Sequence, residues 1–280
     1  MKFLIFGNGW LGNKFHNFFT ESSISTSDIT KFDLVEKEII SKKPEVVINC
    51  AGKTGRPNID WCEDHKFETY SSNVTGPFTL ASACSKLNIK LVHIGSGCIY
   101  QGDNNGKGYS ETDEPNFFGS FYSRTKIWSE EALKEFPNVL QVRIRMPIDG
   151  IPSDRNLITK ITNYKRVISV KNSITALTPD FFNAVRILCE RNKTGIYNLT
   201  FPGSIEHKEI LDLYKEIVDR NFSYELFSLD ELHNVTKAKR SNCVLNNDKI
   251  TREIQLPNVR EALKECLYEY SNNFNKVISK

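Results

Sequence analysis

The chain has 280 residues, a net charge of +3, 39% hydrophobic and 25% charged residues, which is ordinary for a globular protein with a sizeable core. No long basic run or basic–aromatic stripe is present, and no apolar stretch approaches the roughly 20 residues of a spanning helix, so neither nucleic acid nor a membrane is an expected partner. The seven cysteines are scattered without a CxxC pair, which argues against a metal site or a disulfide framework and favours reduced thiols in the cytoplasm.

The first half of the chain alternates strand-like and helix-like segments. The run Lys2–Phe6 predicts a buried strand and is too short for a signal peptide. The segments that follow it, taken in order, are a helix at 11–20, a helix from 33 that ends at Pro44, a strand from 46, a helix at about 62–86, a strand at 90–96, a polar loop at 103–119, a helix from 120 and a strand at 139–145. This alternation predicts an α/β fold with a mostly parallel sheet covered on both faces.

After Arg145 the pattern changes. Two prolines and a glycine predict a crossing loop, and the rest is mainly helical, with one strand from Gly195. The predicted helices are 156–164, 180–191, 207–219, 228–239 and 259–277, and Ser228 with Glu231 forms a capping-box pattern. We expect a nucleotide-binding domain at 1–146. Residues 147–280 should be mainly a substrate-binding domain over the carboxyl ends of the strands, with some segments returning to the first domain.

A glycine-rich turn follows the first predicted strand directly. Gly7, Gly9 and Gly12 allow the backbone to approach a pyrophosphate closely, and the following helix N-terminus attracts the anion. Trp10 is expected to line or flank the dinucleotide. At the expected end of a second strand, Thr26, Ser27 and Asp28 are followed by Lys31. An acid there favours NADH and a basic residue favours the 2′-phosphate of NADPH, so the two cues conflict. We expect NADPH, with NADH as the alternative.

Tyr122 and Lys126 are four residues apart on a predicted helix, which places them on one face. An ammonium beside a phenol should lower the tyrosine pKa and prepare Tyr122 for proton transfer to a carbonyl. Ser96, at the end of a neighbouring strand, is placed to hydrogen-bond the same oxygen. The alternative is an ordinary amphipathic helix with a packed tyrosine and an exposed lysine.

These motifs together resemble the extended short-chain dehydrogenases/reductases. More specific blocks resemble the epimerase/reductases that complete UDP-L-rhamnose synthesis in plants, and a giant-virus member would fit the composition rich in Lys, Asn and Ile. The blocks are KTGRPNIDWCE (53–63), GSGCIY (95–100), PNFFGSFYSRTK (115–126), VRIRMPI (142–148), RNLITKI (155–161) and RSN (240–242). The phosphate loop departs from the family pattern by being one residue shorter.

The resemblance implies that UDP-4-keto-6-deoxy-D-glucose is inverted at C3 and C5 and then reduced at C4. It implies a homodimer through the Tyr122 helix, in a cytoplasm (the host's, for a viral protein), with the preceding dehydratase on another protein. It also implies that Lys126 holds the cofactor ribose and Tyr122 contacts the cofactor. The further cofactor contacts implied are Leu11, Asn49, Ala51 and Gly52.

Inversion needs a base on one face of the sugar ring and an acid on the other, since the protons beside the C4 ketone are acidic. Cys98 lies two residues after Ser96, and on an extended segment that spacing keeps both on one face. Lys160 matches the family position for the partner, and burial with the cation Lys126 nearby should lower its pKa. Which of Cys98 and Lys160 is the base stays open, and Cys98 as a core filler is the alternative.

Four residues are candidate substrate contacts: Arg56, Asn58, Asn73 and Arg240. The arginines suit a diphosphate because their guanidinium forks bind it bidentately. Asn73 has a second interpretation, as a structural bridge between helix and strand. Two other functions remain open, a reductase without epimerase activity and a non-catalytic NADP-binding regulatory subunit. UDP against dTDP as the carrier is also undecided.

Overall fold

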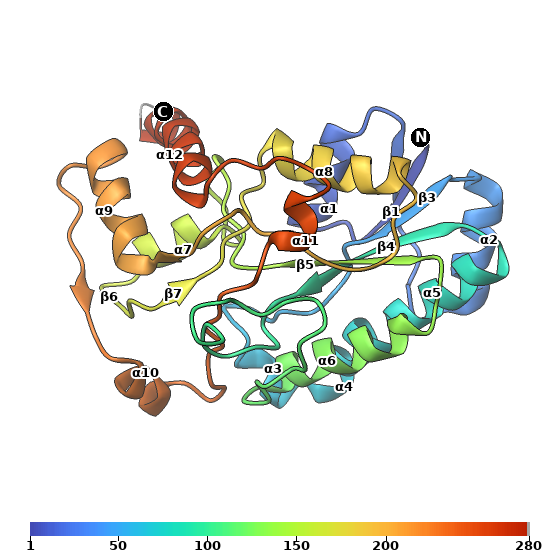
Figure 1. The fold of residues 1–280 in the computed structure, drawn as a ribbon, viewed down its shortest axis with the longest axis horizontal. Helices are drawn as coiled ribbons and strands as arrows, with labels where there is room; N and C mark the ends of the chain where they lie inside the picture. Colours follow the sequence, from blue (N-terminus) through green and yellow to red (C-terminus); the bar gives the residue numbers. More distant parts are fainter. Residues whose placement is uncertain (279–280) are drawn as a thin grey trace.

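A six-stranded parallel sheet forms the centre of the computed structural model, which describes residues 1–278 (Figure 1). The strand order is β2-β1-β3-β4-β5-β8. The strands are β1 (Phe3–Phe6), β2 (Ser22–Ser25), β3 (Val46–Asn49), β4 (Lys90–Ser96), β5 (Val139–Ile144) and β8 (Gly195–Asn198). The predicted α/β fold is therefore confirmed. The bounds of β2 were not predicted, because Ile24 is its only apolar residue.

The sheet is buried on both faces, as the continuous apolar runs predict. In β1, Phe3 and Ile5 join one core cluster, while Leu4 and Phe6 join another. The first cluster includes residues of α1 (Trp10–Phe18), α8 (Pro179–Glu190), α9 (His207–Ile217) and α12 (Val259–Ile278). The second lies against α2 (Phe32–Lys42) and α5 (Gly76–Lys86), and α6 (Phe121–Lys134) packs beside α5 (Figure 1).

The single helix predicted over 62–86 is wrong. The structure divides it into α3 (Trp61–Asp64), α4 (Lys66–Tyr70), a π-helical turn η1 (Ser71–Thr75) and α5. His65 has non-helical dihedrals between α3 and α4. Pro77 has no N–H for the helical ladder, and the N–H of Gly76 bonds to the carbonyl of Ser71, five residues back.

The second half adds short elements around the end of the sheet (Figure 1). These are α7 (Leu157–Thr162), β6 (Arg166–Val167), β7 (Lys171–Asn172), β9 (Ile205–Glu206), β10 (Glu225–Leu226), α10 (Leu229–Val235) and α11 (Asp248–Thr251). The capping box at Ser228 is confirmed, although α10 ends at Val235, before the predicted Lys239. The sequence did not predict the two-residue strands, which are too short to give a periodic pattern. The domain division at residue 146 stays a prediction, and β8 lies beyond it in the central sheet.

Within the described residues, no helix combines the length and apolar character needed to cross a membrane.

Candidate active site

The glycine turn between β1 and α1 has the geometry of a dinucleotide cradle. Gly7 has φ +104°, and a Cβ there would overlap the backbone of Ala51. Gly9 is the N-cap of α1 and has open space where a Cβ would stand, and the first turn of α1 carries no acidic residue. An anion is therefore free to approach the helix N-terminus. Trp10 and Leu11 pack partly against the main core.

Replacing Gly12 by alanine should destabilise this turn, because the new Cβ would overlap the carbonyl oxygen of Gly7. We expect Gly12→Ala to lower the free energy of unfolding by about 1–3 kcal/mol. Gly9→Ala is the matched control, since its Cβ meets nothing within 4 Å, and should cost less than about 1 kcal/mol. Urea unfolding of both variants measures the difference, and equal losses would contradict the close approach of Gly12 and Gly7.

The segment after β3 is fixed by two buried asparagines. Asn49 accepts a hydrogen bond from the Ala51 N–H at 3.0 Å and contacts the His93 ring. Asn73 accepts from the Lys53 N–H at 2.7 Å and donates to the Lys53 carbonyl and to the Thr125 hydroxyl. Asn73 is 1% exposed, so the structure gives it the bridging position rather than a place on the cavity wall. Gly52 lies close to the Asn73 amide oxygen.

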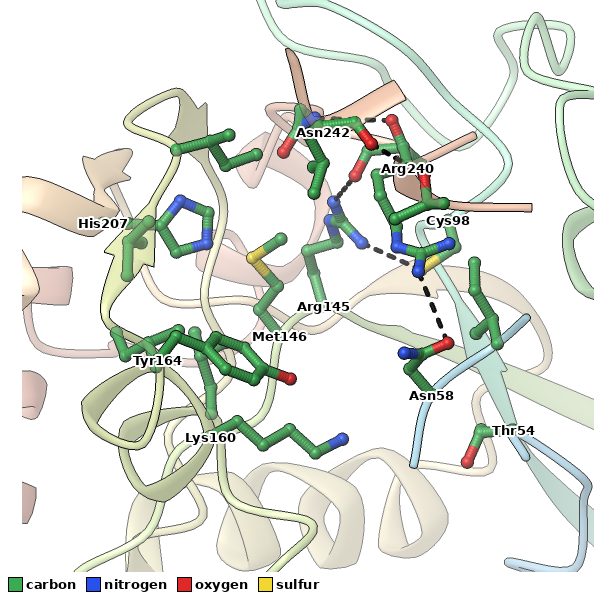
Figure 2. Close-up of a pocket in the computed structure, with 18 of the residues that line it drawn as sticks. Thr54, Asn58, Cys98, Arg145, Met146, Lys160, Tyr164, His207, Arg240 and Asn242 are labelled. Atoms are coloured by element: carbon green, nitrogen blue, oxygen red, sulfur yellow. Dashed lines mark hydrogen bonds between the residues drawn. The ribbon is translucent and has the colours of Figure 1, made fainter. Parts of the chain in front are cut away.

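A cavity of about 760 Å³ opens beyond the carboxyl ends of β4 and β5 (Figure 2). Five residues predicted for the site line it: Asn58, Cys98, Tyr122, Lys160 and Arg240. The wall is completed by residues from many segments, including Thr54, Arg145, Met146, Arg155, Tyr164, Val167, His207, Phe227 and Asn242. Both halves of the chain thus contribute, as expected for an open α/β sheet. Within residues 1–278, no group of three or more His, Cys, Asp or Glu is arranged to hold a metal ion.

Cys98 lies in a turn, so the extended conformation predicted for it is wrong. β4 ends at Ser96, whose hydroxyl accepts a hydrogen bond from the Cys98 N–H at 3.1 Å. The Cys98 carbonyl accepts from the Ser123 hydroxyl at 2.6 Å, which ties the turn to α6. The thiol is partly exposed and faces the cavity, where it accepts a hydrogen bond from Arg145 at 2.8 Å.

Tyr122 and Lys126 are both 8% exposed on α6. Burial raises the pKa of Tyr122, Cys98 adds to the rise, and a hydrogen bond from Ser96 opposes it. The prediction that Lys126 lowers the Tyr122 pKa is therefore wrong, because desolvation of the phenolate dominates. Burial also lowers the pKa of Lys126 to about 8, with Cys98 and Glu130 opposing.

Lys160 reaches the cavity from α7. Asn156 is the N-cap of this helix. Its side chain accepts a hydrogen bond from the Ile158 N–H and donates to two carbonyls of the crossing loop. Burial lowers the pKa of Lys160, the charge of Arg155 adds to the lowering, and Asp154 opposes it. The prediction that burial lowers the pKa of Lys160 is thus confirmed. The prediction that Lys126 adds to this lowering is wrong.

Two further arginines bring positive charge to this region: Arg155 on the cavity wall and Arg56 in a neighbouring cavity. Arg155 donates to the Thr54 hydroxyl at 2.7 Å and to the Gly55 carbonyl at 3.0 Å, which joins the crossing loop to the loop after β3. Arg56 lines a neighbouring cavity of about 470 Å³ that shares Arg155 and Lys160 with the first.

Arg240 lies on the cavity wall, and the carboxylate of Asp60 balances its positive charge. It forms two hydrogen bonds with Asp60, at 2.8 and 3.0 Å. A third hydrogen bond joins it to Asn58 at 3.3 Å (Figure 2). A diphosphate would therefore meet an arginine–carboxylate pair here. At Arg155 it would meet a guanidinium for which residues 1–278 show no ion pair.

The cavity residues that the sequence did not single out include Arg145, Arg155 and His207. The position of Arg145 could have indicated a site residue, since it lies at the end of a predicted strand, at the ligand-binding edge of the sheet. His207 gave no such indication, because it opens a helix far along the chain. Burial lowers the pKa of His207 to about 4, and Arg145 adds to the effect.

The end of β2 offers hydroxyl groups rather than a free carboxylate. The Asp28 carboxylate accepts hydrogen bonds from the Thr30 N–H and hydroxyl at 2.9 and 2.8 Å, so it serves the local turn. Lys31 is exposed at the N-cap of α2. This arrangement favours a negatively charged group at the ribose over a bare 2′-hydroxyl.

Residues 1–164 match the family model described as the RmlD substrate binding domain. The chain is 40% identical to a bifunctional dTDP-4-dehydrorhamnose 3,5-epimerase/dTDP-4-dehydrorhamnose reductase of Arabidopsis thaliana, over 96% of this chain and 93% of that protein. It is also 40% identical to a trifunctional UDP-glucose 4,6-dehydratase/UDP-4-keto-6-deoxy-D-glucose 3,5-epimerase/UDP-4-keto-L-rhamnose-reductase of the same plant, where the match takes up 42% of the longer protein.

Solved structures show the same fold. A UDP-rhamnose synthase from Acanthamoeba polyphaga mimivirus superposes with a TM-score of 0.92 at 36% identity, covering 96% of this chain and 99% of that one. A dTDP-4-dehydrorhamnose reductase from Bacillus anthracis in complex with NADP superposes with a TM-score of 0.82 at 22% identity, covering 96% and 100%. At that identity the second likeness shows the fold alone.

Proposed function

This chain belongs to the family of the RmlD substrate binding domain, and we propose that it converts UDP-4-keto-6-deoxy-D-glucose to UDP-L-rhamnose with NADPH. The observation that carries the proposal is one cavity that holds Tyr122, Cys98 and Lys160 together. The first serves reduction of a ketone, and the other two serve inversion beside it. The names of these relatives, which include epimerase, reductase and UDP-rhamnose synthase, support the proposal.

NADPH would bind at the glycine turn. The N-terminus of α1 suits its pyrophosphate, and Lys31 with the hydroxyls after β2 suits its 2′-phosphate. Bound there, it supplies the hydride for the C4 ketone. Lys126, buried on α6, fits the ribose-holding position that the family implies.

Tyr122 is the proposed proton donor to O4 during reduction. Its raised pKa keeps the phenol protonated at neutral pH, which suits a donor. Ser96 lies beside it and supports the same oxygen. During inversion the same two hydroxyls stabilise the enolate oxygen, as donors in an oxyanion hole do.

Cys98 and Lys160 are the proposed proton-transfer pair for C3 and C5. They come from separate elements, the turn after β4 and the helix α7, and reach the cavity from different sides (Figure 2). A keto sugar bound between them would lose a proton on one face to give a planar enolate, and the enolate would gain a proton on the other face. A reductase without epimerase activity has no use for this pair.

The test uses the intact protein with UDP- and dTDP-4-keto-6-deoxyglucose. In deuterium oxide without NADPH, deuterium should enter C3 and C5, and added NADPH should be oxidised with formation of the rhamnose nucleotide. Oxidation of NADPH without deuterium exchange, and only with a sugar that is already inverted, would show a reductase alone. Neither reaction would point to a non-catalytic subunit.

A homodimer through α6 is part of this proposal. Phe67, Tyr70 and Trp128 form an exposed aromatic group on α4 and α6, with exposures of 81%, 45% and 42%. Replacing Trp128 by lysine should convert a dimer, of about twice the 32.1-kDa chain mass, to a monomer in light scattering. Tyr268→Lys is the control, because Tyr268 is 59% exposed on α12. A wild-type monomer would contradict the prediction.

A further inference from the structure

Arg145 is a buried cation without a carboxylate partner. It is 3% exposed and donates to the Cys98 sulfur at 2.8 Å, to the Asn172 amide oxygen at 2.7 Å and to the Ser241 carbonyl. In the part of the chain that the structure describes, no ion pair joins Arg145 to an acidic side chain. Arg143, two residues earlier and equally buried, has two hydrogen bonds to the Glu130 carboxylate.

A buried guanidinium is costly unless an anion compensates its charge. The amide and carbonyl oxygens around Arg145 are neutral, so the thiol is the one bonded group that can become negative by losing a proton. A sulfur that accepts a hydrogen bond from a guanidinium is also better suited as a thiolate than as a thiol.

The other titratable groups around this pair do not replace Cys98 as the anion. Burial raises the pKa of both Tyr122 and Cys243, which keeps them protonated, and the Cys243 thiol donates to the Gly97 carbonyl. His207 is neutral at pH 7 because burial and Arg145 lower its pKa to about 4. Lys126 is a second cation near Cys98 and favours a thiolate as well.

We propose that Arg145 is a positioning residue that holds Cys98 as a thiolate facing the cavity, so that Cys98 is the base and Lys160 the acid of the inversion. The assignment of base and acid rests on the proposed function. The thiolate bonds to the proton on C3 or C5, and the electron pair of the broken C–H bond passes into the enolate and onto O4. The Lys160 ammonium then protonates the opposite face, and the thiol and the neutral amine each exchange a proton with water before the next inversion.

Alkylation of Cys98 by iodoacetamide tests the ion pair without any nucleotide sugar, because the thiolate is the reacting form. The rate is followed from pH 6 to 10 by mass spectrometry of the Cys98 peptide. Arg145→Met should slow alkylation of Cys98 at pH 7 by about tenfold or more. The increase of the alkylation rate with pH should then occur at higher pH than in the wild-type protein. Arg145→Lys should restore much of the rate. The matched control is Arg166→Met, which removes a cavity arginine paired with Glu231 and should leave the Cys98 rate unchanged.

Unchanged alkylation in folded Arg145→Met, or equal slowing in both methionine variants, would overturn the proposal. Asn172→Asp covers the case in which Arg145→Met does not fold, since it keeps the guanidinium and offers it a carboxylate in place of the thiolate. It should slow alkylation as well, and an undiminished rate would count against the pair. If Cys98 in the wild-type protein is alkylated rapidly in a way that depends on Arg145, but no deuterium enters the sugar, the proposed function is contradicted and the ion pair is still supported.

Discussion

Replacing Cys98 by alanine should abolish entry of solvent deuterium into C3 and C5 of the 4-keto sugar. The Cys98 sulfur is the proposed proton acceptor on its side of the cavity. The loss of a positioned acid or base typically lowers a rate by about 10²–10⁴-fold. The measurement is deuterium incorporation by NMR, with enzyme and nucleotide sugar but no NADPH. A substrate already inverted at C3 and C5 should still be reduced, because Tyr122 is intact.

Two further variants make the result specific. Cys98→Ser keeps the size but offers a hydroxyl, a far weaker acid than a thiol, and should also be slow. Cys62→Ala removes a thiol that is 0% exposed and does not line the cavity, so exchange should persist. Exchange at normal speed in Cys98→Ala would refute the epimerase assignment for this residue.

The sequence alone predicted the sheet, the glycine turn and the helix with Tyr122 and Lys126, because each depends on local spacing. It missed the division of the helix over 62–86, where Pro77 and His65 interrupt the ladder in ways that apolar periodicity does not show. The bounds of β2 were missed because this polar strand has no apolar periodicity. Its pairing with β1 stabilises it instead.

Charge environments were the least predictable part of the site. Arg143 and Arg145 are two residues apart and look alike in the sequence, yet one meets Glu130 and the other Cys98. The pKa of Tyr122 likewise follows from how deeply the chain buries it, which no spacing rule supplies. The cation near Lys160 proved to be Arg155, from the crossing loop that joins the two halves of the chain.

Replacing Tyr122 by phenylalanine should nearly stop NADPH oxidation, by about 10²–10⁴-fold, because O4 would lose its proton donor as the hydride arrives. The phenol is buried and its pKa is raised, so in the wild-type protein it is protonated at neutral pH and can act as the donor. Deuterium exchange should fall less, because Ser96 still supports the enolate oxygen. Stopped-flow absorbance of NADPH with an already inverted substrate isolates the reduction step.

Tyr164→Phe is the matched control, since Tyr164 also lines the cavity and would lose the same hydroxyl. It should keep most of the NADPH oxidation, because Tyr164 lies beyond Lys160 at the start of the segment that leads to β6. If the two variants oxidised NADPH equally well, the donor would have to be another group. Lys126 would be the first to examine, because its pKa of about 8 lets it release a proton near neutrality.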